Sequence, residues 1–254
     1  MILAHELVGR HDAPAVVLVH GITESHRSWH PLIEPLARHH SVLAVDLRGH
    51  GDSDHDDPYD MPAYAGDVIE TYTALGMRDV LLVGHSLGGA VVTAAAAMAP
   101  CAAVVNVDQP LRLAAFKDAL TAIEPALKGT SANFTATMQA MYDSMAGPLG
   151  PVESARLSSI RRPDQTVVLG TWQTVFDSTP EQLDATVGAM LSGVTVPYLS
   201  LHGDDPGDDY ATWLTSHCAN ATIEVWPGHG HYPHLVDQQR FLDRIMAFEA
   251  EVRG

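Results

Sequence analysis

A serine set among glycines, Ser86 in the stretch Gly84-His85-Ser86-Leu87-Gly88-Gly89, is the residue best placed for chemistry in this chain. The apolar run 80–83 before it predicts a buried strand, and the Ala- and Val-rich run 90–99 after it predicts a helix packed on a sheet. A serine in a tight strand-to-helix turn has a strained backbone that exposes its hydroxyl, and the glycines avoid collisions with neighbouring elements. The pattern therefore predicts a nucleophile for covalent catalysis.

A nucleophilic serine needs a general base, and a histidine-rich loop near the end of the chain can supply one. The chain has 15 histidines, so the candidate base is chosen by its position in the predicted fold. The loop 227–234 lies between the last predicted strand and the last predicted helix. Such a loop leaves the same edge of a parallel sheet as the serine turn. His231, after the flexible Gly230, is the predicted base, and His229 and His234 are expected to pack in the loop or pocket. A metal site at the His-x-His pair is disfavoured, because no cysteine or glutamate accompanies it at ligand spacing.

The base in turn needs an acid that orients it, and this acid should follow a strand end. Asp108 follows the apolar run 103–107, and Asp204 and Asp205 follow the run 196–202. Loop aspartates beside Gly and Pro are commonly turn formers, so one or two of these three are expected to be structural.

The elements that must position these residues alternate between short apolar runs and helical patterns, which predicts parallel βαβ units and an α/β fold. Predicted strands span residues 15–20, 41–47, 80–83, 103–108, 196–202 and 222–226. Predicted helices span 29–39, 63–76 and 90–99, and a closing helix places Phe241, Ile245, Phe248 and Val252 on one face. The predicted core is therefore 1–108 together with 194–254.

Between the two parts of the core, residues 109–193 carry only helical stripes of apolar residues, which predicts an all-helical cap inserted in the core. Such an insertion beside the serine turn would roof the site and line an apolar pocket. Met141 and Trp172 from this segment, with Trp29 and His85 from the core, are the candidate pocket residues.

The composition limits the classes of molecule that the chain is expected to bind. The formal charge of −17 and pI near 5.1 disfavour nucleic acid and anionic membranes, since the long-range field would repel both. No apolar run reaches the ~18 residues of a membrane span, and no signal segment opens the sequence. Two cysteines are too few for a disulfide framework, so a reducing cytoplasm is expected. A small-molecule substrate is the expected partner.

Together the motifs resemble the α/β-hydrolase family with a helical cap over essentially the whole chain. The matching motifs are His20-Gly21-Ile22-Thr23, Asp46-Leu47-Arg48-Gly49-His50-Gly51-Asp52-Ser53, Gly84-His85-Ser86-Leu87-Gly88-Gly89, His202-Gly203-Asp204-Asp205 and Gly228-His229-Gly230-His231. The resemblance implies a mostly parallel sheet flanked by helices, Ser86 as nucleophile and His231 as base. It also implies an oxyanion hole formed by the backbone N–H groups of Ile22 and Leu87, and no cofactor or metal.

At the position of the aspartate that orients the histidine, the chain departs from the family pattern Gly-x-x-Asp, because the third residue after Gly203 is Pro206. A one-residue deletion aligns Asp205 with the family acid, so Asp205 is preferred. Asp108 occupies a position that some relatives use instead, and Asp204 would need a different loop bend.

The resemblance implies hydrolysis of a carboxylic ester or related acyl compound through an acyl-enzyme on Ser86. The substrate is expected to be small and largely apolar, because the predicted roof is rich in Met and aromatic residues and contains few charges. Relatives use the same triad as cofactor-free haloperoxidases, which intercept the acyl-enzyme with hydrogen peroxide, or as hydrolases of carbon–carbon bonds. Other relatives keep the triad as slow-turnover ligand sensors. The sensor alternative is the less favoured, since the predicted cap helices are amphipathic and offer no obvious apolar patch to a partner.

Overall fold

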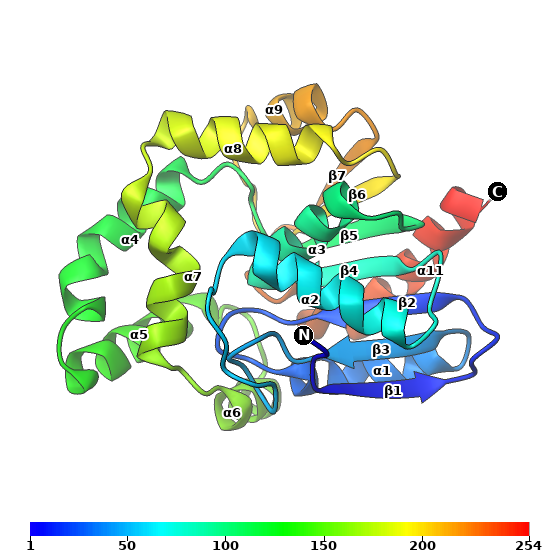
Figure 1. Ribbon diagram of the computed structural model, residues 1–254, viewed down its shortest axis with the longest axis horizontal. Coiled ribbons are helices and arrows are strands. Elements are labelled where there is room, and N and C mark those ends of the chain that lie inside the picture. The colour runs from blue at the N-terminus through cyan, green and yellow to red at the C-terminus, as the bar shows by residue number, and fades with distance from the viewer. Residues whose placement is uncertain (254) are drawn as a thin grey trace.

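The computed structural model describes residues 1–253 and is organised around a seven-stranded, mostly parallel sheet (Figure 1). The strand order is β1-β3-β2-β4-β5-β6-β7, and only β1 is antiparallel to its neighbour. The strands are β1 (His5–Gly9), β2 (Ala15–Val19), β3 (Ser41–Val45), β4 (Leu81–His85), β5 (Ala103–Val107), β6 (Tyr198–His202) and β7 (Ala221–Val225). This architecture confirms the predicted α/β-hydrolase fold class.

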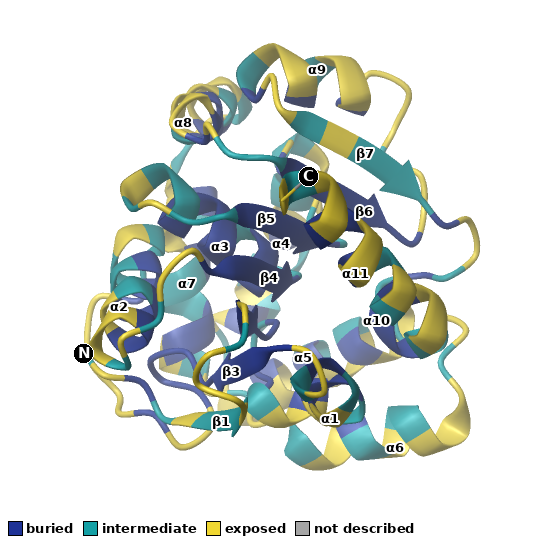
Figure 2. Ribbon diagram, turned by 90° about the vertical axis from the view of Figure 1, so that its right-hand side faces the viewer, coloured by how far each residue is buried: buried dark blue, intermediate teal, exposed yellow. Residues whose placement is uncertain are grey.

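The central strands β2 to β6 are buried along their whole length (Figure 2). Continuous runs of Val, Leu and Ala suit strands that are covered on both faces, which explains why the sequence predicts them. The edge strand β1 has the mixed sequence His-Glu-Leu-Val-Gly and is only partly buried, so it lacks the apolar run of its neighbours.

Helices cover both faces of the sheet (Figure 1). On one face, α2 (Met61–Ala74) and α3 (Leu87–Met98) join α8 (Pro180–Ser192) and α9 (Tyr210–His217) in a single apolar core. On the other face, the 3₁₀ turn η1 (His26–Trp29), α1 (His30–Ala37), α10 (Pro233–Val236) and α11 (Gln238–Arg253) form a second core. Because β2 to β7 run parallel, the connections from these strands to the following helices leave the sheet at its carboxyl edge. Ligand sites of such sheets form at this edge.

Between β5 and β6 the chain is helical, and we call residues 109–193 the helical segment. It contains α4 (Ala114–Leu127), α5 (Ser131–Met145), α6 (Pro151–Ile160), α7 (Gln165–Asp177) and the already named α8. Helices α4, α5 and α7 extend beyond the sheet (Figure 1) and have an apolar core of their own that includes Phe134, Met138 and Trp172. Pro125 lies in the last turn of α4, close to the end of the helix.

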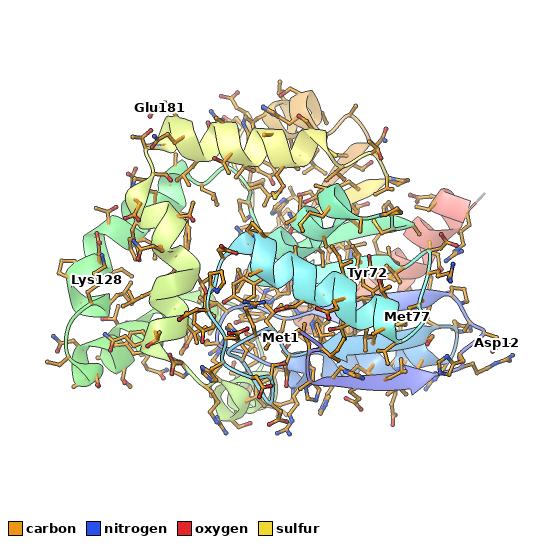
Figure 3. The ribbon with its side chains drawn as sticks, in the orientation of Figure 1. Met1, Asp12, Tyr72, Met77, Lys128 and Glu181 are labelled. Carbon is orange, nitrogen blue, oxygen red and sulfur yellow. The ribbon has the colours of Figure 1, made fainter. Side chains whose placement is uncertain are left out.

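Charged side chains such as Lys128 and Glu181 lie on the outer side of the helical segment, away from the sheet (Figure 3). Within residues 1–253, no helix combines the length and the hydropathy that a membrane crossing requires.

Candidate active site

Ser86 lies in the turn between β4 and α3 with φ 52° and ψ −122°, a conformation that a non-glycine residue rarely adopts. Its backbone N–H donates to Val107 O at 2.9 Å, which fixes the turn to β5. A Cβ at Gly84 would collide with the backbone of Gly88, and one at Gly88 would collide with the backbone of Val19. The glycines thus permit the close packing of strand and helix that forms the turn and places the half-buried serine at the cavity.

His231 is oriented by Asp108 at the carboxyl edge of the sheet. The imidazole Nδ1 lies 2.7 Å from Asp108 Oδ2, and the other carboxylate oxygen accepts the backbone N–H of Gly203 at 2.8 Å. An ionised carboxylate only accepts, so Nδ1 carries the proton and Nε2 is the free basic nitrogen. Ser86 and His231 line the same cavity, without a hydrogen bond between their side chains in the described chain. Such bonds are often long in an unliganded site and shorten in the substrate complex.

The preference for Asp205 as the orienting acid is wrong. Asp204 and Asp205 are both exposed, and Asp205 Oδ1 accepts the N–H of Gly207, which is the local turn of a surface loop. Gly203 lies so tightly against the backbone of Gly230 that a Cβ there would collide with it. The loop after β6 has Asp204 and Asp205 on the surface, and the aspartate after β5, Asp108, bonds the histidine instead.

Two backbone N–H groups lie beside the serine without a protein acceptor in the described chain, those of Ile22 and Leu87. Leu87 is the first residue of α3, where N–H groups have no intrahelical partner. Ile22 lies in the loop after β2, and His20 supports this loop: Nδ1 contacts Gly21 O at 2.7 Å while Nε2 accepts from Leu47 N at 3.0 Å.

These residues line a cavity of about 460 Å³ between the sheet edge and the helical segment. Of the predicted pocket residues, His85, Met141 and Trp172 belong to its lining, together with Phe116 and Val175. Trp29 does not belong to it, and that prediction is wrong. It is fully buried in the core, and its ring lies 4.7 Å from that of His234.

One wall of the cavity is charged, which the sequence did not predict. Arg161, after α6, donates to the Tyr232 hydroxyl at 2.6 Å, and that hydroxyl donates to Glu24 Oε1 at 2.9 Å. The second carboxylate oxygen, Glu24 Oε2, is buried and has no hydrogen-bond partner in the described chain, 3.9 Å from His85 Nδ1. The only sequence signal was the proximity of Glu24 to the His20-Gly21 motif and of Tyr232 to His231.

Burial and partners shift the pKa values around the site. Burial would raise the pKa of Asp108, but His231 and the Gly203 N–H more than offset it and hold the pKa below its ordinary value. Burial would likewise raise the pKa of Glu24, whereas His85, Arg161 and the Tyr232 hydroxyl hold it below its ordinary value, so the carboxylate stays ionised at pH 7. Burial lowers the pKa of His85 to about 4, helped by the nearby His231, so this ring is neutral at pH 7.

The His-x-His pair is not arranged around a common point for a metal, because His231 Nδ1 faces Asp108 and His229 Nδ1 faces Trp226 O at 2.9 Å. A group of potential ligand atoms, within 4.8 Å of one another, lies outside the cavity lining on Glu6, His26 and His30. There His30 pairs with Glu6 at 3.2 Å, and His26 Nδ1 bonds the buried carboxylate of Asp46 at 2.9 Å. The absence of a metal remains a prediction.

Comparison with known proteins identifies the family of the chain. The family described as "Alpha/beta hydrolase family" matches residues 16–244. The chain belongs to the alpha/beta hydrolase family. This alpha/beta hydrolase is 27% identical over 266 residues to the non-heme chloroperoxidase of Burkholderia pyrrocinia, covering 94% of this chain and 93% of that protein. It is 35% identical over 98 residues to the esterase YbfF of Escherichia coli, or 39% of each chain.

The fold of this alpha/beta hydrolase is also that of an esterase from Exiguobacterium antarcticum, with a TM-score of 0.80 at 17% identity over 99% of this chain and 96% of the other. Family membership confirms the expectation that the chain is a hydrolase-fold enzyme.

Proposed function

We propose that this alpha/beta hydrolase cleaves a small carboxylic ester or related acyl compound through an acyl-enzyme on Ser86. The observation that carries the proposal is the alignment of His231 by Asp108 beside a serine that is held in a strained turn and lines the cavity. A serine, an oriented base and two free N–H groups around one cavity are the parts that acyl transfer requires.

In the proposed reaction, Ser86 Oγ attacks the carbonyl carbon while His231 Nε2 takes the hydroxyl proton. The carbonyl oxygen becomes negative between the N–H groups of Ile22 and Leu87. Collapse of this intermediate breaks the bond to the alcohol, which leaves with the proton from His231. Water then gives a proton to His231 and attacks the acyl carbon, and the acid is released as Ser86 regains its proton.

The helical segment is proposed to act as the cap over this site. Met141, Trp172 and Phe116 form an apolar wall that suits a short acyl or aryl group, and the cavity of about 460 Å³ limits its size. The ionised Glu24 and Arg161 on another wall favour a substrate that also carries a polar group.

The similarity to a non-heme chloroperoxidase over nearly the whole chain supports a second candidate. In that case hydrogen peroxide, rather than water, attacks the same acyl-enzyme and yields a peracid that oxidises halide. Both candidates use Ser86 and differ only in the second nucleophile.

The test is a burst-phase assay with p-nitrophenyl acetate and butyrate on the wild type, Ser86→Ala and the control Ser131→Ala, an exposed serine on α5. We expect a stoichiometric burst and steady turnover, both lost only in Ser86→Ala. Peroxide-dependent halogenation, measured in parallel, identifies the second candidate. Reaction of Ser86→Ala at the wild-type rate would overturn the covalent mechanism.

A further inference from the structure

Thr23, the residue after Ile22, has a left-handed backbone with φ 65°. A β-branched residue in this region is a conformational outlier, and such strain persists only where surrounding contacts fix it. Thr23 is also almost fully buried, at 1% exposure. The Ile22 C=O and the Thr23 N–H form one peptide unit, which directly follows the residue that carries the Ile22 N–H in the same turn. The Thr23 backbone therefore constrains the turn that orients the Ile22 N–H.

The contacts that hold Thr23 come from the helical segment. Tyr142 Oη, on α5, lies 2.7 Å from Thr23 Oγ1, and the backbone N–H of Arg162 donates to Thr23 O at 2.8 Å. Thr23 Oγ1 donates to Ile22 O at 2.6 Å, so the Tyr142 hydroxyl is the donor in the contact between the two side chains. We call Thr23, Tyr142 and Arg162 the Thr23 clamp.

The same segment also contacts the residue beside the predicted base. Arg161 bonds the hydroxyl of Tyr232, which follows His231, and its guanidinium lies 4.3 Å from the centre of the Tyr142 ring. The Tyr232 hydroxyl in turn donates a hydrogen bond to Glu24, the residue after Thr23. Two adjacent arginines and one tyrosine of the helical segment thus hold both loops that carry the predicted oxyanion donor and base.

We propose that docking of the helical segment sets the position of the Ile22 N–H through the Thr23 clamp, so that Tyr142 and Arg162 are positioning residues for the oxyanion hole. This inference rests on the proposed acyl-transfer function. When α5 is displaced, Thr23 loses the contacts that fix its strained backbone, and the oxyanion donor moves. A substrate too large for the docked segment therefore reacts slowly even when it binds.

The test compares hydroxyl deletions that share chemistry but differ in location. Tyr142→Phe and Thr23→Val remove the two sides of the clamp, and Thr23 does not belong to the cavity lining, so Thr23→Val leaves substrate contacts in place. Tyr64→Phe is the matched control, because Tyr64 Oη also makes a 2.7 Å bond to the helical segment, at Thr171, without contacting the oxyanion loop. Thr23→Ser retains the hydroxyl and tests rescue.

With p-nitrophenyl acetate, we expect Tyr142→Phe and Thr23→Val each to lower kcat about tenfold with KM changed less than about twofold. The double variant should be no worse than either single one, because both remove the same interaction. Affinity for a trifluoromethyl ketone, whose adduct forms an oxyanion, should fall by the same factor as kcat/KM. Thr23→Ser and Tyr64→Phe should remain close to the wild type.

Equal behaviour of Tyr142→Phe and Tyr64→Phe, additive losses in the double variant, or a change confined to KM would overturn the clamp while leaving the acyl-transfer function standing. A wild type that neither turns over the ester nor becomes labelled at Ser86 by a fluorophosphonate would overturn the proposed function and the clamp together. Circular dichroism and thermal unfolding of each variant separate these results from loss of the fold.

Discussion

Asp108 and His231 are separated by 123 positions in the chain and joined by a 2.7 Å hydrogen bond. The carboxylate is held from both sides, by the imidazole and by the N–H of Gly203. It stays ionised because these partners hold its pKa below the ordinary value despite burial. The histidine is therefore fixed in the tautomer that leaves Nε2 free to accept a proton.

Replacing this carboxylate by an amide should remove most of the activity. We expect Asp108→Asn to lower kcat for p-nitrophenyl acetate by roughly a thousandfold to ten-thousandfold, since the amide can leave His231 in the wrong tautomer. Asp205→Asn, at the exposed turn, should keep wild-type turnover and serves as the control. The reverse result would reinstate Asp205 as the acid.

Two glycine substitutions should have opposite effects on stability. Gly88→Ala places a Cβ against the carbonyl groups of Val19 and His20 and should lower the free energy of unfolding by at least about 3 kcal/mol. Gly66→Ala, on α2 with open space around its Cβ, should raise it by about 0.5–1 kcal/mol through helix propensity. Urea unfolding measures both. Equal effects of the two variants would contradict the packing described for the serine turn.

Size selectivity should respond to the apolar wall of the cavity. Met141→Ala enlarges the cavity beside α5 and should raise kcat/KM for p-nitrophenyl hexanoate relative to acetate by about tenfold, the usual worth of one or two methylenes. Met98→Ala, at an exposed methionine on α3, is the control. An unchanged ratio would show that Met141 does not contact the acyl chain.

Stability should fall steeply as the pH drops below about 6.5, well above the range where carboxylates titrate. Burial lowers the pKa of His50 to about 3 and those of His85 and His202 to about 4. The unfolded chain binds protons at these groups below about 6.5 and the folded chain does not. The free energy of unfolding therefore falls by up to about 1.4 kcal/mol per pH unit for each histidine, down to about pH 4.

Urea unfolding between pH 7 and 4.5 measures that slope. His202→Gln should reduce the slope by the equivalent of about one proton, and His11→Gln, at an exposed histidine, is the control variant. Because the measurement is a slope, a constant loss of stability in His202→Gln does not affect the result. An unchanged slope in His202→Gln would show that this histidine is protonated in the fold.

The serine and the base of the site could be predicted from the sequence, because local patterns and the order of strands and helices along the chain place them. Ser86 lies in a local strand-turn-helix pattern, and His231 lies in the loop between the last strand and the last helix. The sequence led to the wrong acid, because which aspartate reaches His231 depends on contacts between residues that are distant in the chain, such as those of Asp108 with His231 and Gly203.

The charged wall could not be predicted for the same reason, since Glu24, Arg161 and Tyr232 come from three distant parts of the chain. Trp29 was misplaced because an aromatic residue near the His20-Gly21 motif can face the pocket or the core, and its contact with His234 decides for the core. The edge strand β1 was missed because it is half-buried and lacks an apolar run.

The helical segment starts and ends on β5 and β6, which are hydrogen-bonded neighbours in the sheet. The chain thus departs from the sheet and returns to it at almost the same place, and the pairing of the two strands does not require any particular length between them. Extra helices could be gained, lost or exchanged there during evolution while the serine turn and the Asp108–His231 pair stay intact. New substrates would then be acquired by changing one continuous stretch of sequence, constrained where it contacts the rest of the chain, as at Thr23, Tyr232 and Tyr64.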